Sequence, residues 1–182
     1  EKGELTVHEA LATGAVHHRL IREGIRWNAN IIVESGTVRD SHHFAVLLGY
    51  GATAVYPYLA YECIHGMVES GEISEQNPLE LGAKYRKGID KGLYKITSKM
   101  GIATIASYRG SQLFEIVGFH DDVVNLCFTG STSRIQGTHF SDLESDTLAL
   151  NKKAFNKRKN ASQGGLLKFV HGEEYHAYNP DV

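Results

Sequence analysis

Short apolar runs alternate with longer segments of helical spacing over the first 70 residues of the chain. Apolar residues that recur every three to four positions predict helices, and short β-branched runs bounded by Gly, Ser or Pro predict buried strands. The predicted helices are residues 6–24, 41–48 and 58–69. The predicted strands are residues 29–34 (ANIIVE) and 52–56 (ATAVY). Strands that alternate with helices in this way are typical of a parallel sheet in an α/β fold.

The first predicted helix carries signals at both of its ends. Thr6 followed by Glu9 has the spacing of a capping box, in which each side chain accepts a hydrogen bond from a free backbone N–H of the other residue. Gly24 follows the last periodic residue and predicts the C-terminal end of the helix.

A polar stretch at residues 69–78 (ESGEISEQNP) is the clearest candidate for a domain boundary or linker. Beyond it, helical spacing predicts helices, which are residues 79–100, 111–117 and 141–155. One further strand is predicted at residues 103–108 (ATIASY), and residues 121–128 fit a helix or a strand equally well. Residues 129–137 and the chain from residue 156 onward are predicted as loops.

Composition places the chain among ordinary globular proteins. Its 182 residues are 42% apolar and 22% charged, which fits one domain or pieces of two larger ones. A net charge of −2 and a pI of about 6.6 give no overall footprint for nucleic acid or an anionic membrane. The mean hydropathy is −0.26, and no run reaches the roughly 20 apolar residues of a membrane span. The start, Glu1-Lys2-Gly3-Glu4, has no Met and no signal-like segment, and we interpret it as an internal cut.

The two cysteines, Cys63 and Cys127, are far apart and both lie among apolar neighbours. Free cysteine is among the most buried residue types, so both are predicted to be buried and reduced. Reduced thiols indicate a cytosolic or plastid-like compartment.

Histidine is frequent, with ten residues, but the spacing does not predict a metal site. Neighbours on a helix point about 100° apart, so the pairs His17-His18 and His42-His43 cannot chelate through both rings. His171 and His176 are five residues apart, whereas a helical metal pair needs four. We therefore expect no structural zinc and no iron–sulfur cluster on this chain.

Three further motifs have ordinary explanations. Gly49-Tyr50-Gly51 connects a predicted helix to a strand, the reverse of the order that a dinucleotide fingerprint needs. Residues 129–137 (TGSTSRIQG), with hydroxyls, two glycines and Arg134, fit an ordinary loop or a phosphate cradle. Residues 151–160 hold five basic residues, which fit a solvated helix end or an interface with an acidic partner.

The most suggestive polar residues flank the predicted strand at residues 103–108. They are Ser98, Lys99, Met100 and Gly101 before the strand, and Ser107, Tyr108 and Arg109 at its end. Functional groups of α/β barrels gather at the carboxyl ends of strands, and a reduced flavin needs positive charge and donors near its ring. The ordinary alternative is a surface Lys99 and an Arg109 that pairs with a carboxylate such as Glu115.

Three segments of the sequence resemble the glutamate synthase family. Residues 89–118 (IDKGLYKITSKMGIATIASYRGSQLFEIVG) closely resemble the opening of the FMN-binding domain of that family. Residues 42–62 (HHFAVLLGYGATAVYPYLAYE) resemble the end of its central domain, and residues 164–182 (GGLLKFVHGEEYHAYNPDV) resemble a segment further into the FMN domain. The resemblance runs essentially from end to end.

The resemblance implies a fold, an activity and partners. Residues 1–72 are expected to be the C-terminal part of the central α/β domain, and residues 73–182 the first part of a TIM-like FMN barrel. The parent enzyme transfers glutamine-derived ammonia to 2-oxoglutarate, with reduction by FMN, to give L-glutamate. A 3Fe–4S cluster passes electrons to FMN from an NADPH-oxidising subunit or from ferredoxin, in the cytoplasm or a plastid.

The resemblance also places the seven residues named above beside FMN. The iron–sulfur ligands and most of the barrel lie outside this chain, since Cys63 and Cys127 do not match the ligand motif. The chain alone is therefore expected to bind no cofactor and to be inactive, and its open barrel edge is expected to cause self-association. The alternative is a purely structural module that joins domains.

Overall fold

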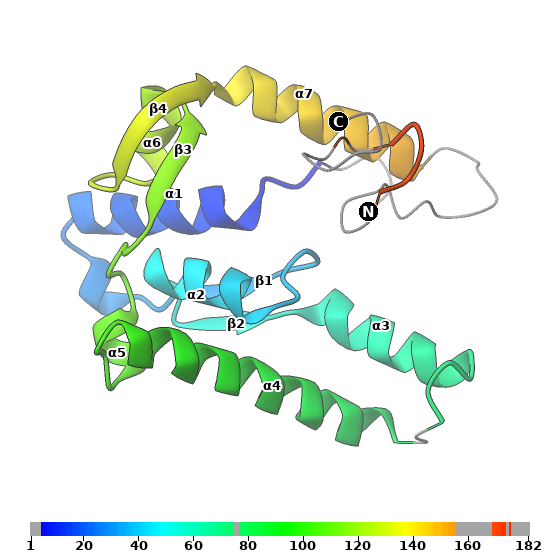
Figure 1. The fold of residues 1–182 in the computed structure, drawn as a ribbon. Coiled ribbons are helices and arrows are strands. Elements are labelled where there is room, and N and C mark those ends of the chain that lie inside the picture. Colours follow the sequence, from blue (N-terminus) through cyan, green and yellow to red (C-terminus); the bar gives the residue numbers. More distant parts are fainter. Residues whose placement is uncertain (1–4, 75–76, 156–168, 174, 176–182) are drawn as a thin grey trace.

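Two pairs of parallel strands, each connected by a helix, organise the chain in the computed structural model, which describes residues 5–74, 77–155, 169–173 and 175 (Figure 1). The strands are β1 (Ile32–Glu34), β2 (Ala54–Tyr56), β3 (Glu115–Phe119) and β4 (Thr132–Thr138). The helices are α1 (Glu9–Arg22), α2 (Ser41–Gly49), α3 (Tyr58–Glu69), α4 (Pro78–Lys99), α5 (Ile105–Tyr108), α6 (Asp121–Cys127) and α7 (Phe140–Ala154), with a short 3₁₀ helix, η1 (Arg26–Asn28).

Each strand pair is a β–α–β unit. β1 pairs with β2 in parallel through α2, with Val33 opposite Val55. β3 pairs with β4 in parallel through α6, with a register that is interrupted after Ile116 and after Val117. These units confirm the α/β fold class, although the described residues form two separate two-stranded sheets.

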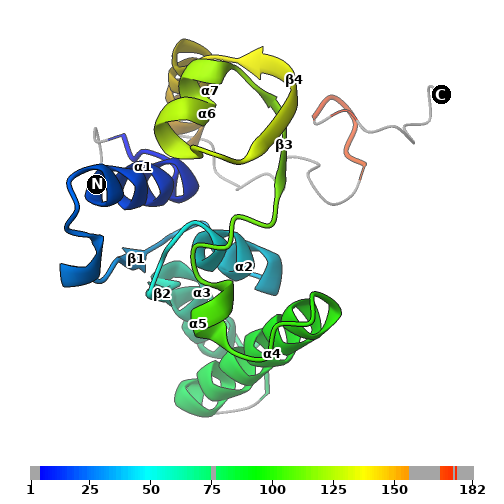
Figure 2. The same cartoon turned by 90° about the vertical axis from the view of Figure 1, so that its left-hand side faces the viewer.

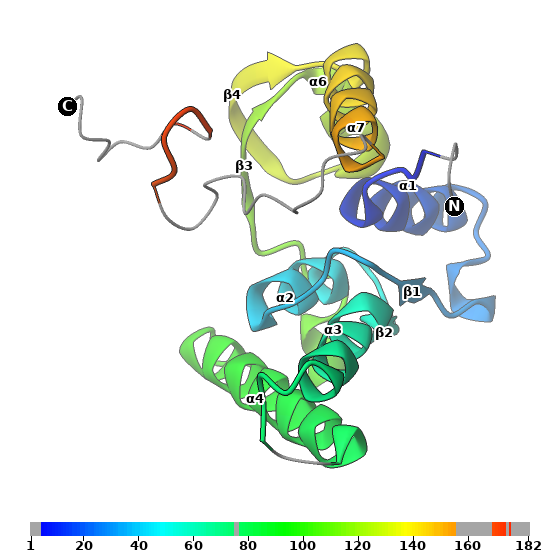
Figure 3. The same cartoon turned by 90° about the vertical axis from the view of Figure 1, so that its right-hand side faces the viewer.

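Helix α1 lies between the two units in all three views (Figures 1, 2 and 3). Its Leu11 joins a core with Val123, Val124 and Cys127 of α6. On the other side, Ala10 and Leu20 pack against the core that contains Val33 of β1. A side chain at Gly14 would overlap the backbone carbonyl of Cys127, so glycine lets α1 and α6 approach closely. The first helix is therefore the element that holds the two units together.

Helix α4 packs back against the first unit. Ile89 and Leu93 share a core with Ala45 and Leu48 of α2 and with Tyr108. The Tyr85 hydroxyl donates to the carbonyl of Arg39 at 2.8 Å. Residues on both sides of the boundary predicted at 72 and 73 therefore contribute to one core, and the position of that boundary stays a prediction.

The predicted strand at residues 103–108 is wrong. The chain instead forms the single helical turn α5, because Thr104 accepts a hydrogen bond from the Ser107 amide and caps the turn. The run has no neighbouring strand, so a strand there would leave its backbone groups unpaired. The first barrel strand, and with it the barrel edge expected there, is absent at this position.

Two further predictions in the second unit are wrong. Residues 111–117, predicted as a helix, lead into strand β3, and residues 129–137, predicted as a loop, form most of β4. Each strand is specified by pairing with the other, and the paired residues are 17 to 19 positions apart in the sequence. A local pattern does not report such a non-local effect. The undecided residues 121–128 form α6.

The other predicted elements are confirmed with small shifts. The helices at residues 41–48, 58–69, 79–100 and 141–155 correspond to α2, α3, α4 and α7. The capping box of α1 is wrong, because His8 is the N-cap residue and its ring accepts from the Ala10 amide at 3.2 Å. The segment resembling the FMN domain at residues 164–182, and the loop from residue 156, lie mostly outside the described residues.

Cys127 is buried, as predicted, but Cys63 is exposed. Helix α3 carries Cys63 and packs mainly against α4. None of its residues is fully buried. Within the described residues, no helix is both long and apolar enough to cross a membrane.

Candidate functional site

The first group of predicted site residues lies at the end of α4. Thr97 is buried, and its hydroxyl donates to the carbonyl of Leu93 at 3.1 Å. The side chains of Ser98, Lys99 and Met100 are exposed at this end. Gly101 then adopts a φ of +70°, a left-handed conformation that ends the helix. A shallow pocket of about 350 Å³ opens beside this turn, lined by Tyr94, Thr97, Ser98, Gly101, Ile102 and Ala103.

The second group lies on α5, directly after this pocket. Ser107 is exposed, and its hydroxyl lies 2.9 Å from that of Thr104. Tyr108 points the other way and is fully buried against α2 and α4. Burial raises the pKa of the Tyr108 phenol, whose oxygen has no hydrogen-bond partner within the described residues. Tyr108 therefore acts as a core residue in this arrangement, and Ser107 and Arg109 are the members of the group that face outward.

Arg109 is exposed, and the pairing with Glu115 that we considered as its ordinary role is wrong. Glu115 instead accepts from Nε of Arg134 at 3.3 Å. Among the described residues, no ion pair of Arg109 is found. The backbone around Arg109 is nevertheless fixed, because the Gly110 amide donates to the Leu48 carbonyl at 2.9 Å and the Gln112 amide to the Gly49 carbonyl at 3.0 Å.

The charge of Arg109 acts on a second guanidinium, that of Arg26. Burial, and after it the charge of Arg109, lowers the pKa of Arg26, although a guanidinium stays protonated in any protein. Arg26 donates through Nε to Nδ1 of His17 at 3.0 Å and through Nη2 to the Gly51 carbonyl at 2.8 Å. We call His17, Arg26, Gly51, Arg109 and Gly110 the two-arginine cluster. Arg26 also donates through Nη1 to the Ala29 carbonyl, so all three of its nitrogens are engaged within the chain. Arg109 is therefore the cation of the cluster that suits an anionic ligand.

His17 is the neutral member of the two-arginine cluster. Burial lowers its pKa to about 4, and the charges of His18 and Arg26 act in the same direction. The ring fills the space beside Gly51, whose φ of +104° and lack of a side chain are both required there. His17 is therefore unprotonated at neutral pH and accepts the hydrogen bond that orients Arg26.

A polar cluster continues from His18 towards the second unit. Gln112 has a φ of +52°, which is rare for a residue other than glycine. Its side-chain amide donates to the carbonyl of Thr129 at 2.9 Å and to the hydroxyl of Ser131 at 3.2 Å. The Tyr50 hydroxyl lies 3.0 Å from the same Ser131 hydroxyl. These contacts fix the segment after Arg109 to both units.

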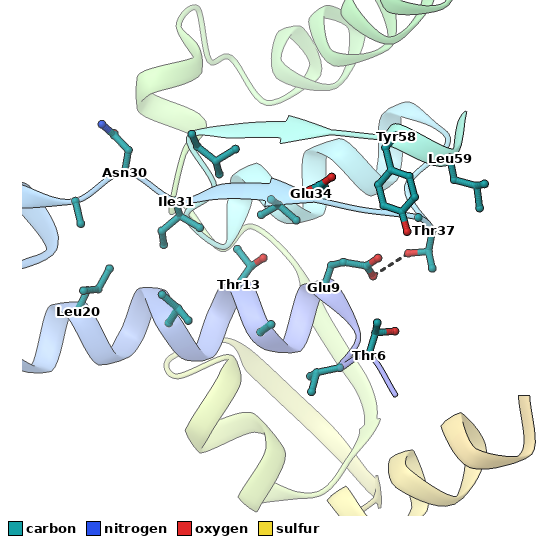
Figure 4. A pocket seen from close by; sticks show the side chains of 17 residues that line it. Thr6, Glu9, Thr13, Leu20, Asn30, Ile31, Glu34, Thr37, Tyr58 and Leu59 are labelled. Atoms are coloured by element: carbon teal, nitrogen blue, oxygen red, sulfur yellow. Dashed lines mark hydrogen bonds between the residues drawn. The ribbon is translucent and has the colours of Figure 1, made fainter. Parts of the chain in front are cut away.

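A larger cavity of about 870 Å³ lies between α1 and β1 (Figure 4). Its walls are mainly apolar, and Ile32 is 73% exposed. The Glu9 carboxylate lies at one end of the cavity, where it accepts from the Ser35 hydroxyl at 2.7 Å and from the Thr37 hydroxyl at 2.8 Å. Burial opposes ionisation of Glu9, but these hydrogen bonds prevail and lower its pKa. The carboxylate is thus occupied in joining α1 to the end of β1.

Sequence reasoning found Lys99 and Arg109 but missed Arg26 and His17. The structure does not bring all seven predicted residues together in one pocket: Ser98 and Gly101 line the shallow pocket, and Arg109 belongs to the two-arginine cluster. Arg26 lies 83 positions before Arg109 in the sequence, and no spacing rule links them. The adjacent pair His17-His18 is the one feature of the local sequence that draws attention to the two-arginine cluster.

Basic residues near the C-terminus have a local role. Of residues 151–160, only 151–155 are described, and Lys152 and Lys153 lie in the last turn of α7, where cations are favoured. Lys153 donates to Glu173 at 3.1 Å.

Comparison with known sequences identifies relatives across most of the chain. Residues 1–120 match the sequence model of the glutamate synthase central domain. A ferredoxin-dependent glutamate synthase of Pyropia yezoensis is 40% identical over 98% of this chain and 12% of its own length. The NADPH glutamate synthase large chain of Bacillus subtilis is 40% identical over 93% of this chain and 11% of its own length. The NADH glutamate synthase of Saccharomyces cerevisiae is 39% identical over 94% of this chain and 8% of its own length.

The chain thus spans about a tenth of the length of these curated relatives. The matched residues 1–120 extend past the boundary predicted at residues 72 and 73, through α5 and β3.

Proposed function

We propose, from the premise that this chain belongs to the glutamate synthase family, that it works as part of an enzyme that transfers glutamine-derived ammonia to 2-oxoglutarate and reduces the product to L-glutamate. The observation that carries this proposal is the match to relatives of that name over more than nine tenths of the chain. The alternative of a purely structural module gains no observation of its own, since the exposed cations Lys99, at the end of α4, and Arg109, directly after α5, fit a binding role.

FMN is the cofactor that we propose for the parent enzyme. When bound, it supplies the reducing equivalents for the reaction. The Arg109 guanidinium is exposed, and it has no ion-pair partner among the described residues. Its charge acts on Arg26, and these features fit a ligand group that carries negative charge. We propose that Ser98, Lys99, Met100, Gly101, Ser107 and Arg109 lie at the FMN site. Tyr108 contributes from beneath, because its buried ring positions the backbone of Ser107 and Arg109.

The remaining cofactor and the electron donor belong to other parts of the parent enzyme. Cys63 and Cys127 lie on α3 and α6, are respectively exposed and buried, and do not form a ligand set for a 3Fe–4S cluster. We propose that the second part of the chain, expected from residue 73 onward, leads into the FMN barrel, although residues up to 120 match the central domain. We also propose that ferredoxin or a nicotinamide-oxidising partner supplies the electrons, and that the enzyme works in the cytoplasm or a plastid.

The test is an assay of the full-length polypeptide that contains these residues. Purified protein should show a flavin absorbance spectrum and form glutamate from glutamine and 2-oxoglutarate only when reduced ferredoxin or a reduced nicotinamide is added. The 182-residue chain alone should show no flavin absorbance. A full-length protein without flavin, or without glutamate formation with any of these donors, would contradict the proposal.

A further inference from the structure

Two histidines and one aspartate meet on the second unit, away from the two-arginine cluster. Nδ1 of His120 lies 3.0 Å from one oxygen of Asp122, and Nδ1 of His139 lies 3.2 Å from the other. The two imidazole rings lie against each other, with centroids 3.8 Å apart and planes tilted by 30°. The potential ligand atoms of the three residues all lie within 4.8 Å of one another. The expectation that the chain has no convergent histidines is therefore wrong at this place.

The parallel pairing of β3 and β4 brings these residues together. Phe119 of β3 is paired with Thr138 of β4, and the His120 amide donates to the Thr138 carbonyl at 3.0 Å. His120 and His139 are thus the first residues after the ends of two parallel strands. Ligands of α/β proteins commonly bind at this edge, beyond the carboxyl ends of the strands. The two histidines are 19 positions apart, and this separation conceals their convergence in the sequence.

The spacing of the ligand atoms suits a shared metal ion. Imidazole nitrogens and carboxylate oxygens bind zinc at about 2.0–2.2 Å, so ligand atoms around one tetrahedral ion lie about 3.3–3.6 Å apart. The two nitrogen–oxygen distances of 3.0 and 3.2 Å are a few tenths of an ångström shorter, so the side chains need to separate only slightly to admit an ion. The Asp122 amide also donates to His120 Nδ1, in a long contact of 3.3 Å that an ion would replace.

The charges around His120, Asp122 and His139 favour a bound cation overall. The positive ends of α6 and α7 face the site and oppose a cation. Asp121 and Asp122 lie in the first turn of α6, and Asp142 lies in the first turn of α7, where it accepts from the His139 amide at 2.8 Å. Three carboxylates outweigh two partial helix charges, so the region is negative.

We propose that His120, Asp122 and His139 bind one divalent transition-metal ion of the zinc class. Two imidazoles and one carboxylate are a ligand set for zinc, cobalt or nickel and not for magnesium or calcium. Each side chain is partly exposed, so an ion can enter from solvent and keep water at its open positions. The ion joins the start of α6 to the start of α7 and thereby stabilises the second unit.

The test is a zinc titration of the full chain after treatment with a chelator. His120→Asn and His139→Asn each remove an imidazole but keep a side chain that caps a helix well, and Asp122→Asn removes the carboxylate. His65→Asn, at an exposed position of α3, is the matched control. Calorimetry should show one zinc ion per chain with micromolar affinity in the original protein and the control. The three ligand variants should bind at least about tenfold more weakly.

A second measurement does not depend on the variants. X-ray absorption at the zinc edge of the loaded original protein should show nitrogen and oxygen ligands, including two imidazoles. The absence of zinc binding up to millimolar concentration would overturn the proposal, because the carboxylate would then only bridge the two rings by hydrogen bonds. One-to-one binding that all three ligand variants retain, or ligation by sulfur, would also overturn it.

Discussion

Nε of Arg26 donates to Nδ1 of His17 over 3.0 Å, so a buried imidazole serves as the acceptor that orients a guanidinium. The same guanidinium lies close enough to Arg109 for the second charge to lower its pKa. The contact joins α1 to the segment before β1 and prepares one of the two cations of the two-arginine cluster. Protonation of His17 would remove the acceptor and place a third positive charge beside the two arginines.

The stability of the chain should fall as the pH is lowered from 6.5 to about 4, partly because of His17. The folded protein holds the pKa of His17 at about 4, whereas the ordinary pKa of histidine is 6.5. Below pH 6.5 the unfolded chain therefore binds more protons than the folded one, and the free energy of unfolding decreases. The loss from His17 amounts to up to ~3 kcal/mol.

The measurement is urea unfolding at pH 7.5, 5.5 and 4.5. His17→Gln keeps a hydrogen-bond acceptor but does not titrate, so its stability should fall less over this range than that of the original chain. Exposed His65→Gln should fall as the original does. Equal declines for His17→Gln and the original chain would show that His17 is not held neutral.

Two glycines of α4 should respond to alanine in opposite directions. A methyl group on Gly92 would overlap the side chain of Ser41 at the start of α2, so Gly92→Ala should destabilise the fold by about 1–3 kcal/mol. Gly88 has nothing within 4 Å of the same position, so Gly88→Ala should gain up to ~1 kcal/mol from helix propensity. Thermal unfolding of both variants checks this, and a shift of the same sign for both would contradict the packing of α4 on α2.

The isolated chain should self-associate through the edge of β1. Within the described residues β1 has β2 as its one partner, and Ile32 is 73% exposed beside the large apolar cavity. A free strand edge with an apolar side chain favours pairing between copies, and a lysine on the edge opposes it. Light scattering should show oligomers for the original chain and fewer for Ile32→Lys.

Leu79→Lys is the control for this prediction, because Leu79 is 77% exposed at the start of α4, away from the cavity. It should associate as the original chain does. A clean monomer of the original chain over a wide concentration range would show that the edge is not available for pairing.

Local patterns predicted the first unit well and the second unit poorly. The strands predicted at residues 29–34 and 52–56 both occur with trimmed ends, but the predicted burial holds only for Val33, since the other residues of β1 and β2 are partly or fully exposed. The residues of β4 are mostly polar and exposed, so its strand character comes from pairing with β3 and not from its own sequence. At residues 103–108 a capping Thr104 outweighed a strand-like pattern.

The candidate functional residues also divide into those that local sequence indicates and those that come together only in the fold. Lys99 and Arg109 could be identified from local sequence, because each is a cation next to the end of a predicted helix or strand. Arg26, His17 and the His120–His139 pair come together only through packing of α1 and pairing of β3 with β4. Tyr108 was expected at the end of a strand beside FMN, but a one-turn helix directs its ring into the core instead.

The most direct test of the account is the flavin content of the full-length protein with single substitutions at the proposed FMN site. Arg109→Lys and Lys99→Ala alter exposed cations of that site, and Lys95→Ala removes an exposed cation from the body of α4. The account predicts lower FMN occupancy or a shifted flavin reduction potential for the first two variants, with unchanged melting temperatures, and original behaviour for the third. Unchanged occupancy and potential in all three, with a lower melting temperature for Arg109→Lys, would contradict it and leave Arg109 a structural residue.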